Sequence, residues 1–105
     1  MAAKFTAKYL DKLIEAATTD AYIESEQVSG FFSLIEDNLV VPFKTRVLGQ
    51  LVTVTGIDIT ESDQIVAICT FGKTAQAIPV LDLPMSAPFP EGAEWVAAYR
   101  RWCGS

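Results

Sequence analysis

The spacing of apolar residues changes from a helical to a strand-like period near Val40, and this change restricts the chain to a mixed fold. Before it, apolar residues recur every three or four positions, as on one face of an α-helix. After it, apolar and polar residues alternate, as in half-buried strands. A helical period returns from Glu91. The sequence therefore predicts an α+β fold in which N-terminal helices and a C-terminal helix pack on a small antiparallel sheet.

Two helices are predicted in the N-terminal part of the chain. The first covers residues 3–18, where an apolar stripe faces the core. The second begins at one of three residues whose side chains cap helices well, namely Thr18, Thr19 or Asp20. Gly30 lies inside this second helix and marks either a break or a position where another segment packs close to the backbone. The helix is predicted to end at Asn38 or on the approach to Pro42.

Three or four short strands are predicted to follow. Apolar residues hold even positions up to Val54 and odd positions from Ile57, so Gly56 is predicted to form a β-bulge. Residues 65–69 form an apolar run that is typical of a central strand buried on both faces. A turn is predicted at 71–73.

A last strand is predicted over residues 76–83, with Pro79 at an edge or an end because proline lacks the N–H that a central strand needs. The strands could form a small curved sheet or a partly open, SH3-like barrel. A proline-rich connector at 84–90 then leads to a helix at 91–103. The aromatic stripe of this helix is predicted to be core, and its members are Trp95, Tyr99 and Trp102.

Length and composition indicate one soluble domain over residues 1–105. The chain has no apolar run of the roughly 20 residues that a spanning helix needs, and its N-terminus lacks a signal-peptide pattern. We therefore expect a cytoplasmic protein without a membrane partner. Cys69 and Cys103 have no metal-binding spacing, and nothing in the sequence indicates an oxidising compartment.

Several function classes are disfavoured by what the sequence lacks. The chain contains no histidine, which is the commonest general base and the commonest transition-metal ligand. The nucleophile-elbow, phosphate-loop, dinucleotide-binding and HExxH motifs do not occur. We therefore expect no enzymatic activity. A net charge of −5, with dispersed bases, also argues against a nucleic-acid partner.

Acidic residues gather in the middle of the chain, where six acids and no bases lie between Lys12 and Lys44. Clustered carboxylates repel one another unless a cation or a basic group neutralises them. Calcium suits such a cluster because it takes 6–8 oxygen ligands in irregular geometry. The simpler alternative is a solvated acidic face, with acids near a helix N-terminus favoured by the helix dipole. The candidate metal ligands are Asp20, Glu24, Glu26, Glu36 and Asp37.

A second acidic set consists of Asp58, Glu61 and Asp63 on a predicted loop between strands. It lacks the glycine and the distal glutamate of an EF-hand loop, so an EF-hand is absent from the chain. Polar loop residues explain this set adequately. It remains a secondary candidate that could join the first set around an ion.

The acidic middle resembles a known family in residues Asp20-Ala21-Tyr22, Glu24, Glu26, Gly30, Phe31-Phe32, Glu36-Asp37-Asn38-Leu39 and Pro42-Phe43. These residues are similar to the pattern D-A-Y-D-E-E-E-x-x-x-G-W-Y-Y-Y-L-E-D-x-L-x-F-P-F of the cyanobacterial calcium-binding protein family, called CcbP-like. The spacing matches without a gap. The likeness extends more loosely over IPVLDLP and the closing helix EWVAAYRRW.

The resemblance implies a small α+β protein that binds Ca²⁺ through carboxylates outside any EF-hand and without catalysis. The five candidate ligands named above fill acidic places of the pattern. Two acidic places are lost, because Ile23 stands where the pattern has Asp and Ser25 where it has Glu. Fewer carboxylates weaken the attraction for the ion.

Two functions follow as hypotheses. The first is a calcium-buffering or calcium-sensing protein that holds one or two ions. The second is an interaction module of the same fold, whose acidic face docks a basic partner protein after useful metal affinity has been lost.

Overall fold

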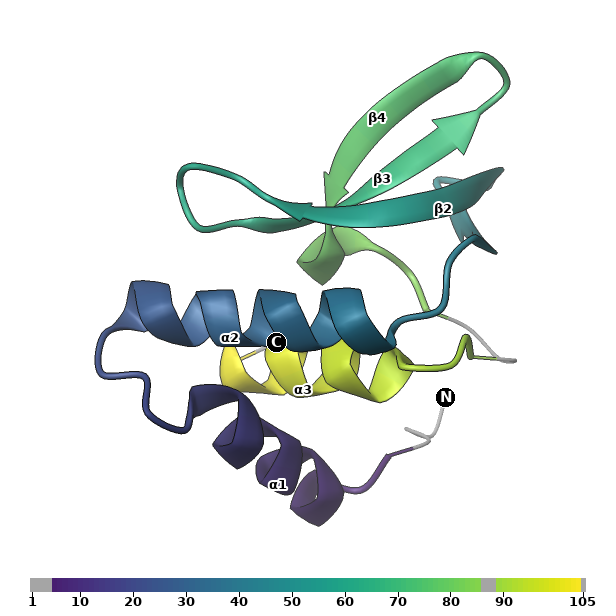
Figure 1. Cartoon of the computed structure of the whole chain (residues 1–105). Helices are drawn as coiled ribbons and strands as arrows, with labels where there is room; N and C mark the ends of the chain where they lie inside the picture. Colours follow the sequence, from purple (N-terminus) through teal and green to yellow (C-terminus); the bar gives the residue numbers. More distant parts are fainter. Residues whose placement is uncertain (1–4, 86–88, 105) are drawn as a thin grey trace.

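The computed structural model describes residues 5–85 and 89–104, and it places three helices beside an antiparallel sheet. Figure 1 shows the sheet above α2 and α3, with α1 below them. In chain order the elements are α1 (Ala7–Thr18), α2 (Glu24–Asn38), β1 (Phe43–Val47), β2 (Gln50–Ile59), β3 (Ile65–Phe71), β4 (Thr74–Pro79), the 3-10 helix η1 (Val80–Asp82) and α3 (Ala93–Trp102). The predicted α+β class is confirmed.

The sheet is a simple meander in the order β1-β2-β3-β4. Its register shifts between Val54 and Gly56, which confirms the predicted β-bulge. The buried strand predicted at residues 65–69 forms the first five residues of β3. Because the described strands leave β1 and β4 as edges, the sheet is open. Of the two forms left open by the sequence, the curved sheet is observed and the barrel is not.

The two turns at one end of the sheet are tight. Val47 pairs with Gln50, so the β1–β2 turn is Leu48-Gly49, and both residues have positive φ. Phe71 pairs with Thr74 across Gly72-Lys73, where Gly72 has positive φ. This second turn confirms the predicted turn at 71–73. Pro79 ends the edge strand β4, as predicted, but the strand does not reach residue 83 because η1 follows it.

The second helix begins at Glu24, so the predicted start at Thr18, Thr19 or Asp20 is wrong. The hydroxyls of Thr18 and Thr19 donate to the carbonyl oxygens of Ile14 and Glu15, at 2.8 and 2.6 Å. They therefore belong to the end of α1. Asp20 has a φ of 64°, a left-handed conformation that separates the two helices. The helix ends at Asn38, as predicted.

Gly30 lies within a continuous α2, so it marks a close approach and not a break. A β-carbon at this position would overlap the backbone carbonyl oxygen of Ala17 in α1. The glycine therefore lets α1 and α2 pack backbone to backbone. On α1, Thr6 caps the first turn by accepting a hydrogen bond from the Tyr9 N–H at 3.1 Å. The first helix begins at Ala7, later than the predicted start; residues 3 and 4 of the predicted range lie outside the described residues.

The core joins the helices through aromatic rings. Phe31 of α2 is fully buried, and its ring centroid lies 5.4 Å from that of Tyr99 and 5.1 Å from that of Trp102. Trp95 is half-buried against the same core, so the aromatic stripe of α3 is core as predicted. The helix itself is shorter than predicted and begins at Ala93.

Arg100 fastens α3 to the segment that leaves the sheet. Its guanidinium donates to the carbonyl oxygen of Val80, with the shorter bond at 2.8 Å, and to that of Leu83. Burial lowers the pKa of Arg100, while the nearby Asp82 raises it. The predicted connector at 84–90 follows, of which 86–88 lie outside the described residues. A membrane span needs a long apolar helix, and none in the described part of the chain qualifies.

Candidate functional site

The five candidate ligands lie along α2 and the turn that precedes it. All five side chains are exposed. Asp20 lies in the α1–α2 turn, Glu24 and Glu26 lie in the first turn of α2, and Glu36 and Asp37 lie in its last turn. We call the first three the N-terminal acids and the last two the C-terminal acids.

The N-terminal acids lie where the helix favours negative charge. The first turn of α2 exposes N–H groups and the positive end of the helix dipole. Ile23 occupies the capping position with a side chain that cannot accept a hydrogen bond. Glu26 binds the segment before the helix, because its Oε1 accepts a hydrogen bond from the Tyr22 N–H at 2.9 Å. Folding therefore accounts for acids at this end.

Glu24 also faces the end of α3. Burial is the main cause that raises the pKa of Tyr99 to about 12, and the charge of Glu24 raises it further. Burial likewise raises the pKa of the Cys103 thiol, with Glu24 acting in the same direction. Cys103 and Cys69 are both free thiols. Glu24 thus lies within electrostatic reach of α3.

The C-terminal acids lie where the helix disfavours negative charge. The last turn of an α-helix exposes carbonyl oxygens and the negative end of the dipole. No basic residue lies in the last turn of α2, all of which is described. Asn38 offers one local donor, because its side-chain amide donates to the Leu34 carbonyl oxygen at 2.8 Å. Glu36 and Asp37 therefore add negative charge to an end that is already negative.

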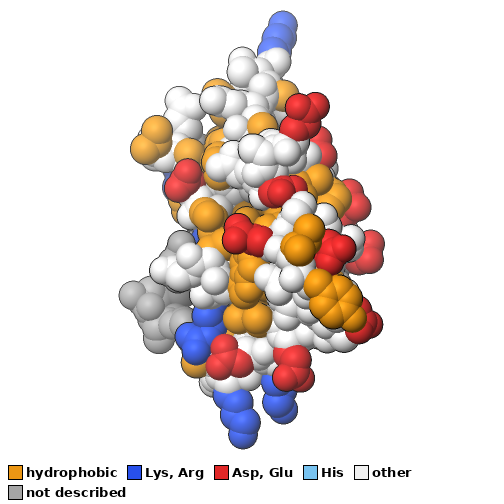
Figure 2. Space-filling view, turned by 90° about the vertical axis from the view of Figure 1, so that its left-hand side faces the viewer, with side chains coloured by type: hydrophobic (Ala, Val, Ile, Leu, Met, Phe, Trp, Pro, Cys, Tyr) orange, Lys and Arg blue, Asp and Glu red, His pale blue; other side chains and the backbone are white. Residues whose placement is uncertain are grey.

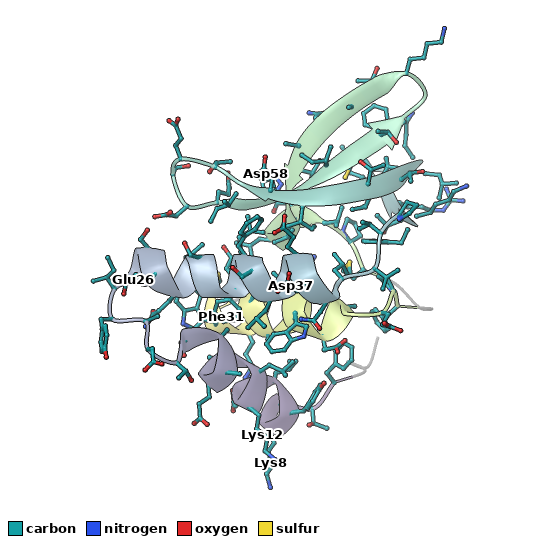
Figure 3. All side chains as sticks on the ribbon, viewed as in Figure 1. Lys8, Lys12, Glu26, Phe31, Asp37 and Asp58 are labelled. Atoms are coloured by element: carbon teal, nitrogen blue, oxygen red, sulfur yellow. The ribbon has the colours of Figure 1, made fainter. Side chains whose placement is uncertain are left out.

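The two groups of acids cannot share one ion. Twelve residues separate Glu24 from Glu36, which at ~1.5 Å per residue is about 18 Å along the helix axis. Calcium–oxygen distances are roughly 2.3–2.6 Å. Figure 3 shows Glu26 and Asp37 at opposite ends of α2.

The second acidic set is divided between a strand and a loop: Glu61 and Asp63 lie in the β2–β3 loop as predicted, whereas Asp58 lies in β2 and pairs with Val66, so its predicted place on the loop is wrong. Asp58 Oδ1 accepts a hydrogen bond from the Ile59 N–H at 2.8 Å, and Thr60 Oγ1 accepts one from the Gln64 N–H at 3.1 Å. These local bonds shape the loop. It lies on the same side of the molecule as the α1–α2 turn (Figure 1). Figure 2 shows that acidic side chains gather on this side, which we call the acidic face. The elements on this side carry exposed acids: Asp20 in the α1–α2 turn, Glu24 and Glu26 in the first turn of α2, and Glu61 and Asp63 in the β2–β3 loop.

The acids offer oxygen donors of the type that calcium prefers, but they are not assembled into a cage. Among residues 5–85 and 89–104, no three Asp, Glu, Cys or His side chains gather closely enough to hold a metal ion. A calcium ion here would take most of its ligands from carbonyl groups and water. The arrangement fits a weak, solvent-exposed site better than a tight one.

Two further features escaped the sequence prediction. Tyr22 and Ile23 are 86% and 60% exposed and interrupt the N-terminal acids with apolar surface. At the other end of the sheet lies a groove of about 520 Å³ with mostly apolar walls. The apolar pair in the run DAYIESE is visible in the sequence. The groove is lined by residues of four strands, so no local sequence pattern predicts it.

Three helices packed beside an open four-stranded meander define a small α+β domain, and solved structures share it. The chain is similar to the crystal structure of CcbP from Anabaena, with a TM-score of 0.76 and 17% sequence identity over 98% of this chain and 95% of that one. It is also similar to a calcium-binding protein in its calcium-binding form, with a TM-score of 0.73 and 18% identity over 99% of this chain and 96% of that one.

These likenesses show that the chain has the CcbP fold, which confirms at the level of fold the resemblance found in the sequence. No protein-family profile matches the sequence. A comparison with curated protein sequences also gives no significant match.

Proposed function

We propose that the chain is a small, non-catalytic, cytoplasmic protein that binds Ca²⁺ and thereby buffers or senses it. The observation that carries the proposal is a fold shared over nearly the whole chain with two proteins, one of them a calcium-binding protein in its calcium-binding form. The acids of the Asp20 to Asn38 segment supply the required oxygen donors without an EF-hand.

The electrostatics of α2 favour its C-terminal end as the main calcium position. A cation is stabilised by the negative end of a helix dipole and by the carbonyl oxygens exposed there. Glu36 and Asp37 add two carboxylates at that end. The N-terminal acids face the opposite polarity, so Asp20, Glu24 and Glu26 form at most a second, weaker position. The chain therefore binds one or two ions, with the first at the C-terminal end of α2.

The exposed and dispersed ligands imply a low affinity. Calcium sites in proteins range over many orders of magnitude, according to charge count and rigidity, and weak ones have dissociation constants on the order of 10⁻⁴–10⁻³ M. Binding to the folded state alone raises the unfolding temperature. We therefore expect measurable stabilisation only at millimolar calcium.

Isothermal titration with Ca²⁺ tests the proposal, with thermal unfolding as a second readout. The double variant Glu36→Gln/Asp37→Asn should lose most of the heat and of the stabilisation. A matched control, Glu15→Gln/Glu91→Gln, removes the same charge from exposed acids outside α2 and should retain both. Absence of heat and of stabilisation in the wild-type protein at millimolar Ca²⁺ would reject calcium binding.

The interaction module remains the second candidate function. Two observations favour it: the acids are not assembled around a metal position within the described residues, and apolar Tyr22 and Ile23 lie exposed among them. Such a surface suits a partner that offers both bases and an apolar concavity. This candidate predicts indifference to calcium and a complex that weakens with salt.

A further inference from the structure

The sheet has a basic end and an acidic end. Residues 43–57 and 65–81, which supply most of its strands, contain three bases and no acid. Residues 58–63 contain three acids and no base. Because the meander places both tight turns at one end and the β2–β3 loop at the other, these charges separate in space (Figure 1). The α1–α2 turn lies with the acidic end.

The apolar groove lies at the basic end. Its walls include Val47, Val52, Phe71, Ile78 and Pro79, and together they bound a volume of about 520 Å³. Two bases lie near these walls: the Arg46 guanidinium donates to the carbonyl oxygen of Gly49, next to Leu48, at 3.4 Å, and Lys73 lies in the turn after Phe71. Asp82 is the acid of the lining, and it lies within electrostatic reach of the half-buried Arg100. A concave apolar surface flanked by bases suits an apolar segment that carries acids.

The exposed Leu48 also indicates that the basic end of the sheet contacts a partner. It lines the groove, is 99% exposed and has a φ of 52°. Tight turns with two positive φ angles strongly favour Asn, Asp or Gly, because branched and bulky side chains are strained in the left-handed region. Burial within the folded chain does not explain a leucine at this position. Contact with a partner would.

The chain carries a segment of the matching chemistry at its opposite end. Tyr22 and Ile23 project from the α1–α2 turn, 86% and 60% exposed, between Asp20 and Glu24. We propose that the groove binds the α1–α2 turn of a second copy of this chain. The two apolar side chains enter the groove, and the flanking carboxylates face Arg46 and Lys73.

This contact is heterologous, because two different surfaces meet. It joins copies head to tail, and each added copy leaves one groove and one turn free. The opposite charges of the two ends steer the copies into register, although whole chains of charge −5 repel one another at long range. The inference does not rest on calcium binding, and its test is carried out in a chelator.

Sedimentation of the purified chain over a range of concentrations tests the inference. We expect the mean mass of the wild-type protein to rise with concentration. The turn variant Tyr22→Ser/Ile23→Ser and the groove variant Arg46→Glu/Lys73→Glu should each remain monomeric. All four positions are exposed, so both variants should fold. The control Lys8→Glu/Lys12→Glu makes the same charge change on α1 and should associate as the wild type does.

Mixing the two variants gives the decisive result. The turn variant retains an intact groove, and the groove variant retains an intact turn. An equimolar mixture should therefore form one-to-one dimers that grow no further. A wild-type chain that stays monomeric throughout would overturn the proposal. So would an association that the variants leave intact, or a mixture that stays monomeric although the wild type associates.

Discussion

The two ends of α2 carry acids in opposite settings. At the N-terminal end the helix dipole favours Glu24 and Glu26, and Glu26 accepts a hydrogen bond from the Tyr22 N–H. At the C-terminal end the dipole disfavours Glu36 and Asp37, and the last turn has no base. Equal charges within one acidic segment therefore need different explanations. Folding accounts for the acids at the first end, whereas the second end is the one at which we propose that a cation binds.

The largest expected effect concerns the middle of α2, which fixes where both ends lie. Gly30→Ala should destabilise the protein by about 1–3 kcal/mol, because the added methyl overlaps the Ala17 carbonyl group, although alanine favours helix by ~1 kcal/mol. Urea unfolding measures the loss. Gly56→Ala is the matched control, since open space surrounds that position and its φ is not positive. Equal stability of the two variants would contradict the close helix packing.

Tyr99 of α3, which lies within electrostatic reach of Glu24, should make the stability of the protein depend on pH at high pH. The pKa of Tyr99 rises from 10.0 to about 12 on folding, so the folded state holds the proton more firmly. The contribution of Tyr99 to the free energy of unfolding is fully present below pH 10. As the pH rises toward 12, up to about 2 kcal/mol of it is lost. The stability of the wild type should therefore fall relative to that of Tyr99→Phe as the pH rises from 10 to 12. Parallel curves would contradict the assigned burial of the hydroxyl.

A better capping residue should stabilise the N-terminal end of α2. Ile23→Asn places a hydrogen-bond acceptor at the capping position of α2 and should stabilise the protein by about 1 kcal/mol. Ile23→Asp should add a similar gain and, because it adds a carboxylate to the N-terminal acids, should also tighten the binding of any calcium ion held there. Thermal unfolding with and without calcium separates the two effects. If both variants respond equally to calcium, the added charge has no role in binding.

The smallest expected effect tests the comparison of the two ends directly. In a chelator, Glu36→Gln and Asp37→Asn should each stabilise the protein by about 0.3–1 kcal/mol, because they remove charge from the negative end of α2. Glu24→Gln should destabilise it by a similar amount. Urea unfolding at low salt resolves such differences. Effects of the same sign at both ends would mean that the dipole does not distinguish them.

The fold could be predicted well where local pattern determines structure. Alternation of apolar residues gave the strands and the bulge at Gly56, and the spacing of aromatic residues gave the core face of α3. The start of α2 was mispredicted because Thr18 and Thr19 cap in either direction. Their hydroxyls donate to carbonyl oxygens of α1. The sequence pattern does not distinguish this arrangement from a cap at the start of α2.

The candidate site could be predicted only as a set of residue types. The acids along α2 were visible in the sequence, but their separation into two ends became clear only with a continuous helix through Gly30. The groove at the basic end was invisible because Val47 and Ile78 are distant in sequence and meet only through the sheet. Sequence spacing thus identified the chemistry, and the tertiary packing determined its location.

Calcium titration of two charge-matched variants tests the central claim most directly. Glu36→Gln/Asp37→Asn and Glu24→Gln/Glu26→Gln each remove two negative charges, from opposite ends of α2. Thermal unfolding at increasing millimolar Ca²⁺ should show that the first variant loses the calcium-dependent stabilisation and the second retains most of it. Full stabilisation of the first variant by calcium would contradict a calcium position at the C-terminal end of α2.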